Sequence, residues 1–74
     1  PRKRKLSYRE QRELEELPGR IEALETRQTE LEAATSDPAF YQQAQDEVAR
    51  VLQELAQLQA ELESAYERWS ELES

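Results

Sequence analysis

The chain has 74 residues, of which 36% are apolar and 36% are charged, with one glycine and neither cysteine nor histidine. This composition is typical of a long helix or a coiled coil, and it argues against a compact globule with an enclosed active site. Without cysteine or histidine, the commonest zinc, thiol and general-base chemistries are excluded. We therefore expect no catalytic residue, no metal site and no enzyme activity. Because the sequence starts at Pro1 and contains no methionine, we expect a piece of a longer protein.

Charge is distributed unevenly along the chain. The formal net charge is −7, but residues 1–12 carry six basic residues against one acid, and residues 13–74 carry four against sixteen. The six are Arg2, Lys3, Arg4, Lys5, Arg9 and Arg12. We expect a positively charged end on a negatively charged body. No apolar run approaches the roughly 20 residues that cross a bilayer, so we expect no membrane segment.

A first helix is predicted over about residues 8–34, after a basic linker end at residues 1–6. Ser7 and Glu10 have the spacing of a capping box, in which each side chain accepts a hydrogen bond from the other residue's backbone N–H. Pro18 disrupts the helix locally, but the apolar pattern keeps its phase across it, so we expect a kink or a short 3₁₀ turn within one helix. The helix has a seam at alternating steps of three and four residues: Leu14, Leu17, Ile21, Leu24, Gln28 and Leu31.

A bend and a second helix follow. Asp37 is expected to cap a short helical turn over about residues 38–43, with Pro38 in its first position. Phe40 and Tyr41 are expected to close the end of the apolar seam. Asp46 is expected to cap the second helix, predicted over about residues 46–72. Its seam has the same alternating steps: Val48, Val51, Leu55, Leu58, Leu62, Ala65, Trp69 and Leu72.

The two seams predict how the helices pair. If the chain folds back antiparallel, residues at the same level have numbers with a constant sum, and pairing Leu31 with Val48 fills every layer of the seam. On one side of the seam this register brings together three oppositely charged pairs, which select it against a slip of one heptad. The pairs are Arg27 with Glu54, Arg20 with Glu61, and Glu13 with Arg68.

We therefore predict an all-α fold, a two-helix antiparallel coiled-coil hairpin over residues 7–74, with a Pro-kinked first helix and a short helical turn at the bend. A monomeric hairpin explains the sequence, and a dimer is the alternative because so few layers leave little margin of stability. The other side of the seam is mostly uncharged, and a partner is one candidate to cover it. Its members include Gln11, Pro18, Leu52, Gln59 and Tyr66.

The open end of the hairpin is the candidate functional surface. The register places Trp69 level with Glu10, so the six basic residues gather beside Tyr8 and Trp69. A cluster of positive charge is the footprint of phosphate binding, and the alternatives are a solvated linker or attraction to acidic protein or lipid. Tyr8 and Trp69 are candidates either for stacking on bases or for capping the seam, and packing against Leu6 and Tyr8 is the favoured role of Trp69. The acidic body would repel a duplex laid along it, so contact is expected at this end.

Several runs in the sequence carry a resemblance to a known family. They are Arg4 to Leu14, Glu16-Leu17-Pro18, Asp37-Pro38 with Phe40-Tyr41, and Ala65 to Trp69 with Glu71-Leu72. Together they cover nearly the whole chain, and it resembles the C-terminal domain of Uup-type ABC-F ATPases. The six basic residues are carried over as candidate nucleic-acid contacts, because most of them fall within the first run.

The resemblance implies a bacterial cytoplasmic parent with two ATP-binding cassettes upstream, whose ATP and Mg²⁺ are the only cofactors expected. It also implies a DNA-binding coiled coil without sequence specificity, and a parent ATPase linked to branched-DNA metabolism, DNA repair and ribosome function. Ribosomal RNA or the ribosome is the other candidate partner. The alternative function is a structural or protein-interaction arm that docks the parent on the ribosome or on its own cassettes, supported by the uncharged flank.

Overall fold

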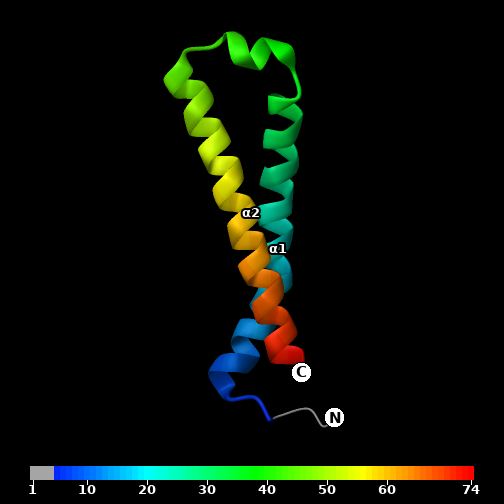
Figure 1. Cartoon of the computed structure of the whole chain (residues 1–74). Coiled ribbons are helices and arrows are strands. Elements are labelled where there is room, and N and C mark those ends of the chain that lie inside the picture. Colours follow the sequence, from blue (N-terminus) through cyan, green and yellow to red (C-terminus); the bar gives the residue numbers. More distant parts are fainter. Residues whose placement is uncertain (1–4) are drawn as a thin grey trace.

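The computed structural model describes residues 5–74, and it contains two long helices joined by a short helical bend. Helix α1 spans Tyr8–Thr35, the 3₁₀ helix η1 spans Pro38–Gln42, and α2 spans Gln45–Glu73. The two long helices run antiparallel, and the molecule extends over 53 × 21 × 17 Å (Figure 1). The predicted fold class, an all-α antiparallel coiled-coil hairpin, is confirmed. No helix in the described part of the chain is long and apolar enough to cross a membrane.

A capping box starts α1, as the sequence predicts. The backbone N–H of Ser7 donates to Glu10 Oε1 at 3.0 Å, and the backbone N–H of Glu10 donates to Ser7 Oγ at 3.1 Å. These bonds satisfy donors that would otherwise lack partners at a helix start. The first two turns of α1, which carry Arg9 and Arg12, therefore start from a capped end at the open end of the hairpin.

Pro18 lies inside α1, and the helix continues through it. A proline cannot donate the usual backbone hydrogen bond to the residue four positions earlier, here Leu14, and its ring crowds that carbonyl. In Figure 1 the first turns of α1 lean away from the axis of the later turns. The neighbouring Gly19 has a negative φ and open space around the position of a Cβ, so it imposes no special backbone conformation. The bend is accordingly attributed to Pro18.

The turn between the helices is held by side chains of its own residues. Asp37 Oδ1 accepts a hydrogen bond from the backbone N–H of Ala39 at 3.0 Å, with Pro38 in the first position of η1. Phe40 is 7% exposed and closes the seam as predicted. Tyr41, predicted to do the same, is 54% exposed, and its hydroxyl instead donates to the backbone carbonyl of Thr35 at 2.9 Å. That carbonyl lies at the end of α1 and has no helical partner, which explains where the tyrosine points.

The predicted cap of α2 is wrong. Ala44 occupies the N-cap position without a side-chain hydrogen bond, and only two residues, Gln43 and Ala44, lie between η1 and the start of α2 at Gln45. Asp46 lies inside the first turn, where its carboxylate accepts from the backbone N–H of Glu47 at 3.0 Å. The negative charges of Asp46 and Glu47 still favour this helix start through the helix dipole.

The core is a single seam that is packed more completely towards the open end. Around its buried members lie the partly buried Leu6, Leu14, Leu24 and Trp69. Towards the bend, Val48, Val51 and Leu55 occupy seam positions but are only partly buried. The largest group of buried residues that contact one another therefore lies towards the open end of the hairpin. The buried cluster consists of Leu17, Ile21, Leu62, Ala65 and Leu72.

Candidate nucleic-acid interface

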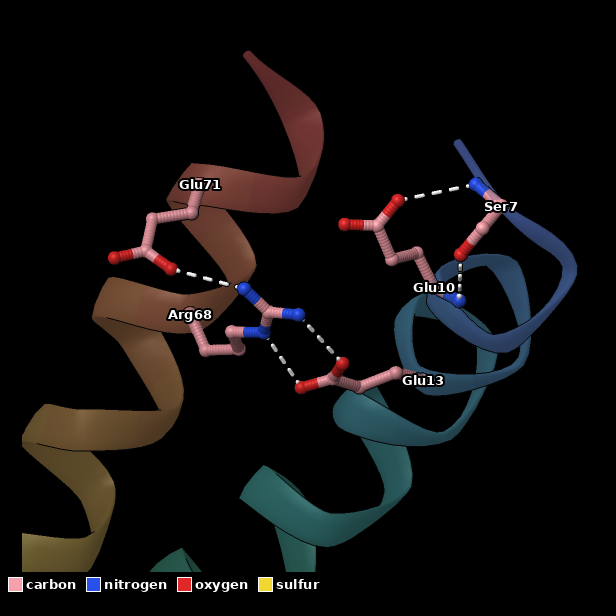
Figure 2. A network of polar contacts seen from close by, with 5 residues as sticks. All are labelled: Ser7, Glu10, Glu13, Arg68 and Glu71. Carbon is pink, nitrogen blue, oxygen red and sulfur yellow. Dashed lines mark hydrogen bonds and ion pairs between the residues drawn. The ribbon is translucent and has the colours of Figure 1, made fainter. Parts of the chain in front are cut away.

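Arg68 joins the two helices at the open end. Its Nε and Nη2 donate to the two carboxylate oxygens of Glu13 at 2.7 and 2.9 Å, and its Nη1 donates to Glu71 at 3.1 Å (Figure 2). The hydrogen bonds that Arg68 donates lower the pKa of the Glu13 carboxyl, and the same bonds, accepted by Glu13 and Glu71, raise the pKa of Arg68. Because two carboxylates surround this guanidinium, Arg68 offers little free positive charge to a ligand. Its role is to fix the position of α1 beside α2.

The other two predicted ion pairs form on the same side of the seam. Arg27 binds both carboxylate oxygens of Glu54, at 2.8 and 3.2 Å, which lowers the pKa of the Glu54 carboxyl. Arg20 and Glu61 approach within 3.9 Å. All three charge pairs that the antiparallel register predicts are therefore present. They also leave three of the four arginines in residues 13–74 neutralised by cross-helix partners.

Tyr8 and Arg12 form an exposed pair on the first turns of α1. The guanidinium carbon of Arg12 lies 6.0 Å from the centroid of the Tyr8 ring, and Nη1 donates to the Tyr8 hydroxyl at 3.2 Å. Nη2 of Arg12 also pairs with Glu16 at 3.5 Å, and these contacts raise the pKa of Arg12. Tyr8 is 74% exposed, so its ring remains open to a ligand on one side. Tyr8, Arg12 and Glu16 are four residues apart, and this spacing in the sequence places the three side chains next to one another on one face of the helix.

Trp69 has a different environment from Tyr8. It is partly buried and packs against the core cluster, as does Leu6. Contact of Trp69 with Leu6 stays a prediction, while Tyr8 is 74% exposed and points to solvent. Of the two aromatic residues that the sequence singles out, Tyr8 is the more accessible to a base.

The remaining basic candidates divide into two groups. Lys5 and Arg9 are exposed and have no ion-pair partner among residues 5–74. Arg2, Lys3 and Arg4 lie outside the described residues. The structure thus brings Lys5, Arg9 and Arg12 to one end of the hairpin, next to Tyr8. No group of three or more acidic, histidine or cysteine side chains placed to hold a metal ion is present within residues 5–74.

One contact of the uncharged flank is not evident from the seam pattern. The hydroxyl of Tyr66 on α2 donates to the carboxylate of Glu25 on α1, and this hydrogen bond raises the pKa of Tyr66. The two residues stand at different levels of the register, so the pairing of the seam positions does not predict this contact.

Comparisons with known proteins agree with this geometry. A family model described as the ABC transporter C-terminal domain matches residues 5–74. The chain is 56% identical over 73 residues to the ATP-binding protein Uup-like and to the ATP-binding protein Uup of Haemophilus influenzae, covering 99% of the chain in each case. It is 43% identical over 70 residues to the ATP-binding protein Uup of Escherichia coli, covering 95% of the chain. It spans only 16%, 11% and 11% of these three relatives.

A solved structure is also similar. The C-terminal domain of the Uup protein, described as a DNA-binding coiled coil motif, superposes with a TM-score of 0.86 at 42% identity. The match covers 90% of this chain and 79% of the solved one. The coiled-coil hairpin is therefore shared with that domain along most of its length.

Proposed function

We propose that this chain, which belongs to the family of ABC transporter C-terminal domains, binds DNA without sequence specificity through the open end of its hairpin. The observation that carries the proposal is the exposed positive charge of Lys5, Arg9 and Arg12 at one end of an otherwise acidic rod. Clustered lysine and arginine side chains are the electrostatic footprint of phosphate binding. The solved C-terminal domain of Uup, described as DNA-binding, supports this assignment.

The distribution of charge determines how DNA would lie. Sixteen acids against four bases in residues 13–74 repel the phosphate backbone along the body of the hairpin. Contact at the open end, with the linker residues Arg2, Lys3 and Arg4 contributing, avoids this repulsion. Phosphate contacts position a protein but do not read sequence, so affinity should vary little between sequences. The exposed ring of Tyr8 can add stacking on an unpaired base, which is equally tolerant of sequence.

The proposal extends to the longer protein. This domain follows ATP-binding cassettes that hold ATP and Mg²⁺ and hydrolyse ATP, and as a monomeric hairpin it brings them to branched DNA in the cytoplasm. A role in DNA repair and an association with the ribosome, through ribosomal RNA, belong to the same proposal. It is supported by the relatives, which are ATP-binding proteins of which this chain matches a small part.

The test compares two double variants that each remove two positive charges. In Arg9→Ala with Arg12→Ala, the losses fall at the open end, and we expect affinity for a labelled DNA duplex at low salt to fall by about tenfold or more. In Arg20→Ala with Arg50→Ala, the losses fall on the body, and affinity should stay within about twofold of the original. Fluorescence anisotropy gives both values. Equal losses in the two variants would show that net charge matters but that the open end is not the binding surface.

A further inference from the structure

Helix α2 carries a second apolar stripe beside the seam that packs against α1. Ala49, Leu52 and Ala56 follow one another at steps of three and four residues, and all three are exposed. Leu52 is 41% exposed. Val48 and Leu55, which adjoin this stripe within the seam, are only partly buried. A helix with two adjacent apolar seams has the pattern of one that packs against two other helices.

The two sides of the hairpin differ in what closes them. We call the side that carries the three cross-helix ion pairs the paired flank. The opposite side, the open flank, has no ion pair between the helices among residues 5–74. In the same residues a hydrogen bond from Tyr66 to Glu25 joins the two helices there. Near the bend the open flank consists of the apolar stripe on α2 and, at the facing levels of α1, Glu22, Glu25 and Glu32.

The charge of the open flank selects the occupant. Glu22, Glu25 and Glu32 are exposed. The four basic residues of residues 13–74 lie away from them, because Arg20, Arg27 and Arg68 form the ion pairs of the paired flank and Arg50 lies on the same side of α2 as that flank. A second copy of this chain would bring another strongly acidic body against these carboxylates, which like-charge repulsion opposes. A partner with apolar residues in line with Leu52 and basic residues in line with α1 would satisfy both features of the surface.

We propose that the open flank near the bend docks a cationic amphipathic helix of a protein partner, which completes a three-helix bundle. The apolar residues of that helix contact Leu52, with Val48 and Leu55 at the edge of the contact. The small side chains of Ala49 and Ala56 let the two helix axes approach closely. Lysine or arginine along one edge of the partner helix pairs with Glu22 and Glu32.

This surface is separate from the DNA-binding surface. The stripe belongs to the part of α2 next to the bend, whereas the start of α1, which carries Arg9 and Arg12, lies at the opposite end of the hairpin (Figure 1). The inference therefore does not rest on DNA binding. A variant of Leu52 should leave DNA affinity unchanged, so the two proposals can fail independently.

The test titrates the full chain with synthetic helical peptides of about 15 residues, near the length at which isolated helices become stable. One peptide has leucine at steps of three and four residues with lysine along one edge. A second replaces the lysines with glutamate, and a third is a scrambled form of the first. We expect the lysine peptide to bind at least tenfold more tightly than either of the others. Isothermal titration calorimetry measures each affinity.

Variants of the chain separate docking from simple charge attraction. Leu52→Glu adds a negative charge, which would strengthen attraction of a cationic peptide, yet docking predicts that it weakens binding at least tenfold. Gln53→Glu adds the same charge one residue away on the outer face of α2 and should not weaken binding. Glu22→Lys with Glu32→Lys should reverse the preference between the lysine and glutamate peptides. Circular dichroism confirms that each variant remains helical.

Several outcomes would overturn the inference. They are no binding of the lysine peptide, equal binding of the scrambled peptide, or no loss of affinity in Leu52→Glu. Sedimentation equilibrium, which measures the oligomeric state, can give a further outcome that overturns the inference. If the chain forms a dimer that Leu52→Glu dissociates, the occupant of the open flank is a second copy and not a cationic partner.

Discussion

Replacing Leu62 with alanine is expected to destabilise the hairpin by about 2–5 kcal/mol, the usual cost of removing a large aliphatic side chain from a packed core. Leu62 is 6% exposed and belongs to the cluster that joins Leu17 and Ile21 of α1 to α2. A hairpin with one layer of core has only a few kcal/mol of stability to lose. The variant should therefore be largely unfolded at room temperature, as measured by urea denaturation followed by circular dichroism.

Leu52 provides the matched control for this prediction. It lies on the same helix and loses the same atoms on replacement by alanine, but it is 41% exposed. Its substitution should change the free energy of unfolding by no more than about 0.5 kcal/mol. If Leu52→Ala and Leu62→Ala cost the same, the seam assigned here does not carry the stability of the fold.

The affinity for duplex DNA is expected to fall about 150-fold when the salt concentration rises fourfold. The expectation follows from contact with about four phosphates, which gives a slope of about −3.6 for log affinity against log salt on a duplex. An acidic chain with net charge −7 would otherwise be repelled by DNA, so such a slope requires local positive charge. Fluorescence anisotropy with a labelled duplex over a salt series measures it.

Single-stranded DNA offers an internal control for the salt dependence. The same four contacts should give a shallower slope of about −2.8, because single strands release fewer counterions per contact. Identical slopes on both forms, or a slope near zero on the duplex, would show that binding does not depend on phosphate neutralisation by the basic end.

The sequence predicts the fold and its register closely because two independent patterns agree. The alternating apolar steps identify the seam, and the charges of Arg27 and Glu54 identify which levels face each other. Arg27 donates to both carboxylate oxygens of Glu54, at 2.8 and 3.2 Å, so the two helices pair in the register that the charges predict. The resemblance to the C-terminal domain of Uup is likewise confirmed, by relatives at 56% identity and by the solved structure.

The errors are at the bend, where local rules compete with the geometry of the connection. Aspartate is a common N-cap residue, which makes Asp46 a candidate, but η1 and α2 lie so close along the chain that Ala44 occupies the N-cap position of α2. Tyr41 has the apolar ring of a seam residue, but an unpartnered carbonyl at the end of α1 accepts its hydroxyl. Neither outcome can be read from periodicity, because both depend on where the chain turns.

The candidate site is less completely predictable than the fold. Basic residues near the amino terminus are visible in the sequence, and the capping box correctly places Arg9 and Arg12 on the first turns of a helix. The partial neutralisation of Arg12 by Glu16 and its contact with Tyr8 require side-chain geometry. Contact with phosphate remains a prediction for all six basic residues, since it depends on the ligand.

The most direct measurement is a titration of the isotopically labelled chain with a short DNA duplex, followed by NMR. If DNA binds at the open end, the backbone amide signals of Lys5, Arg9 and Arg12 shift progressively, while those of η1 at Pro38–Gln42 stay in place. Shifts concentrated at the bend or along the outer face of α2, with the signals of the basic end unchanged, would contradict the account.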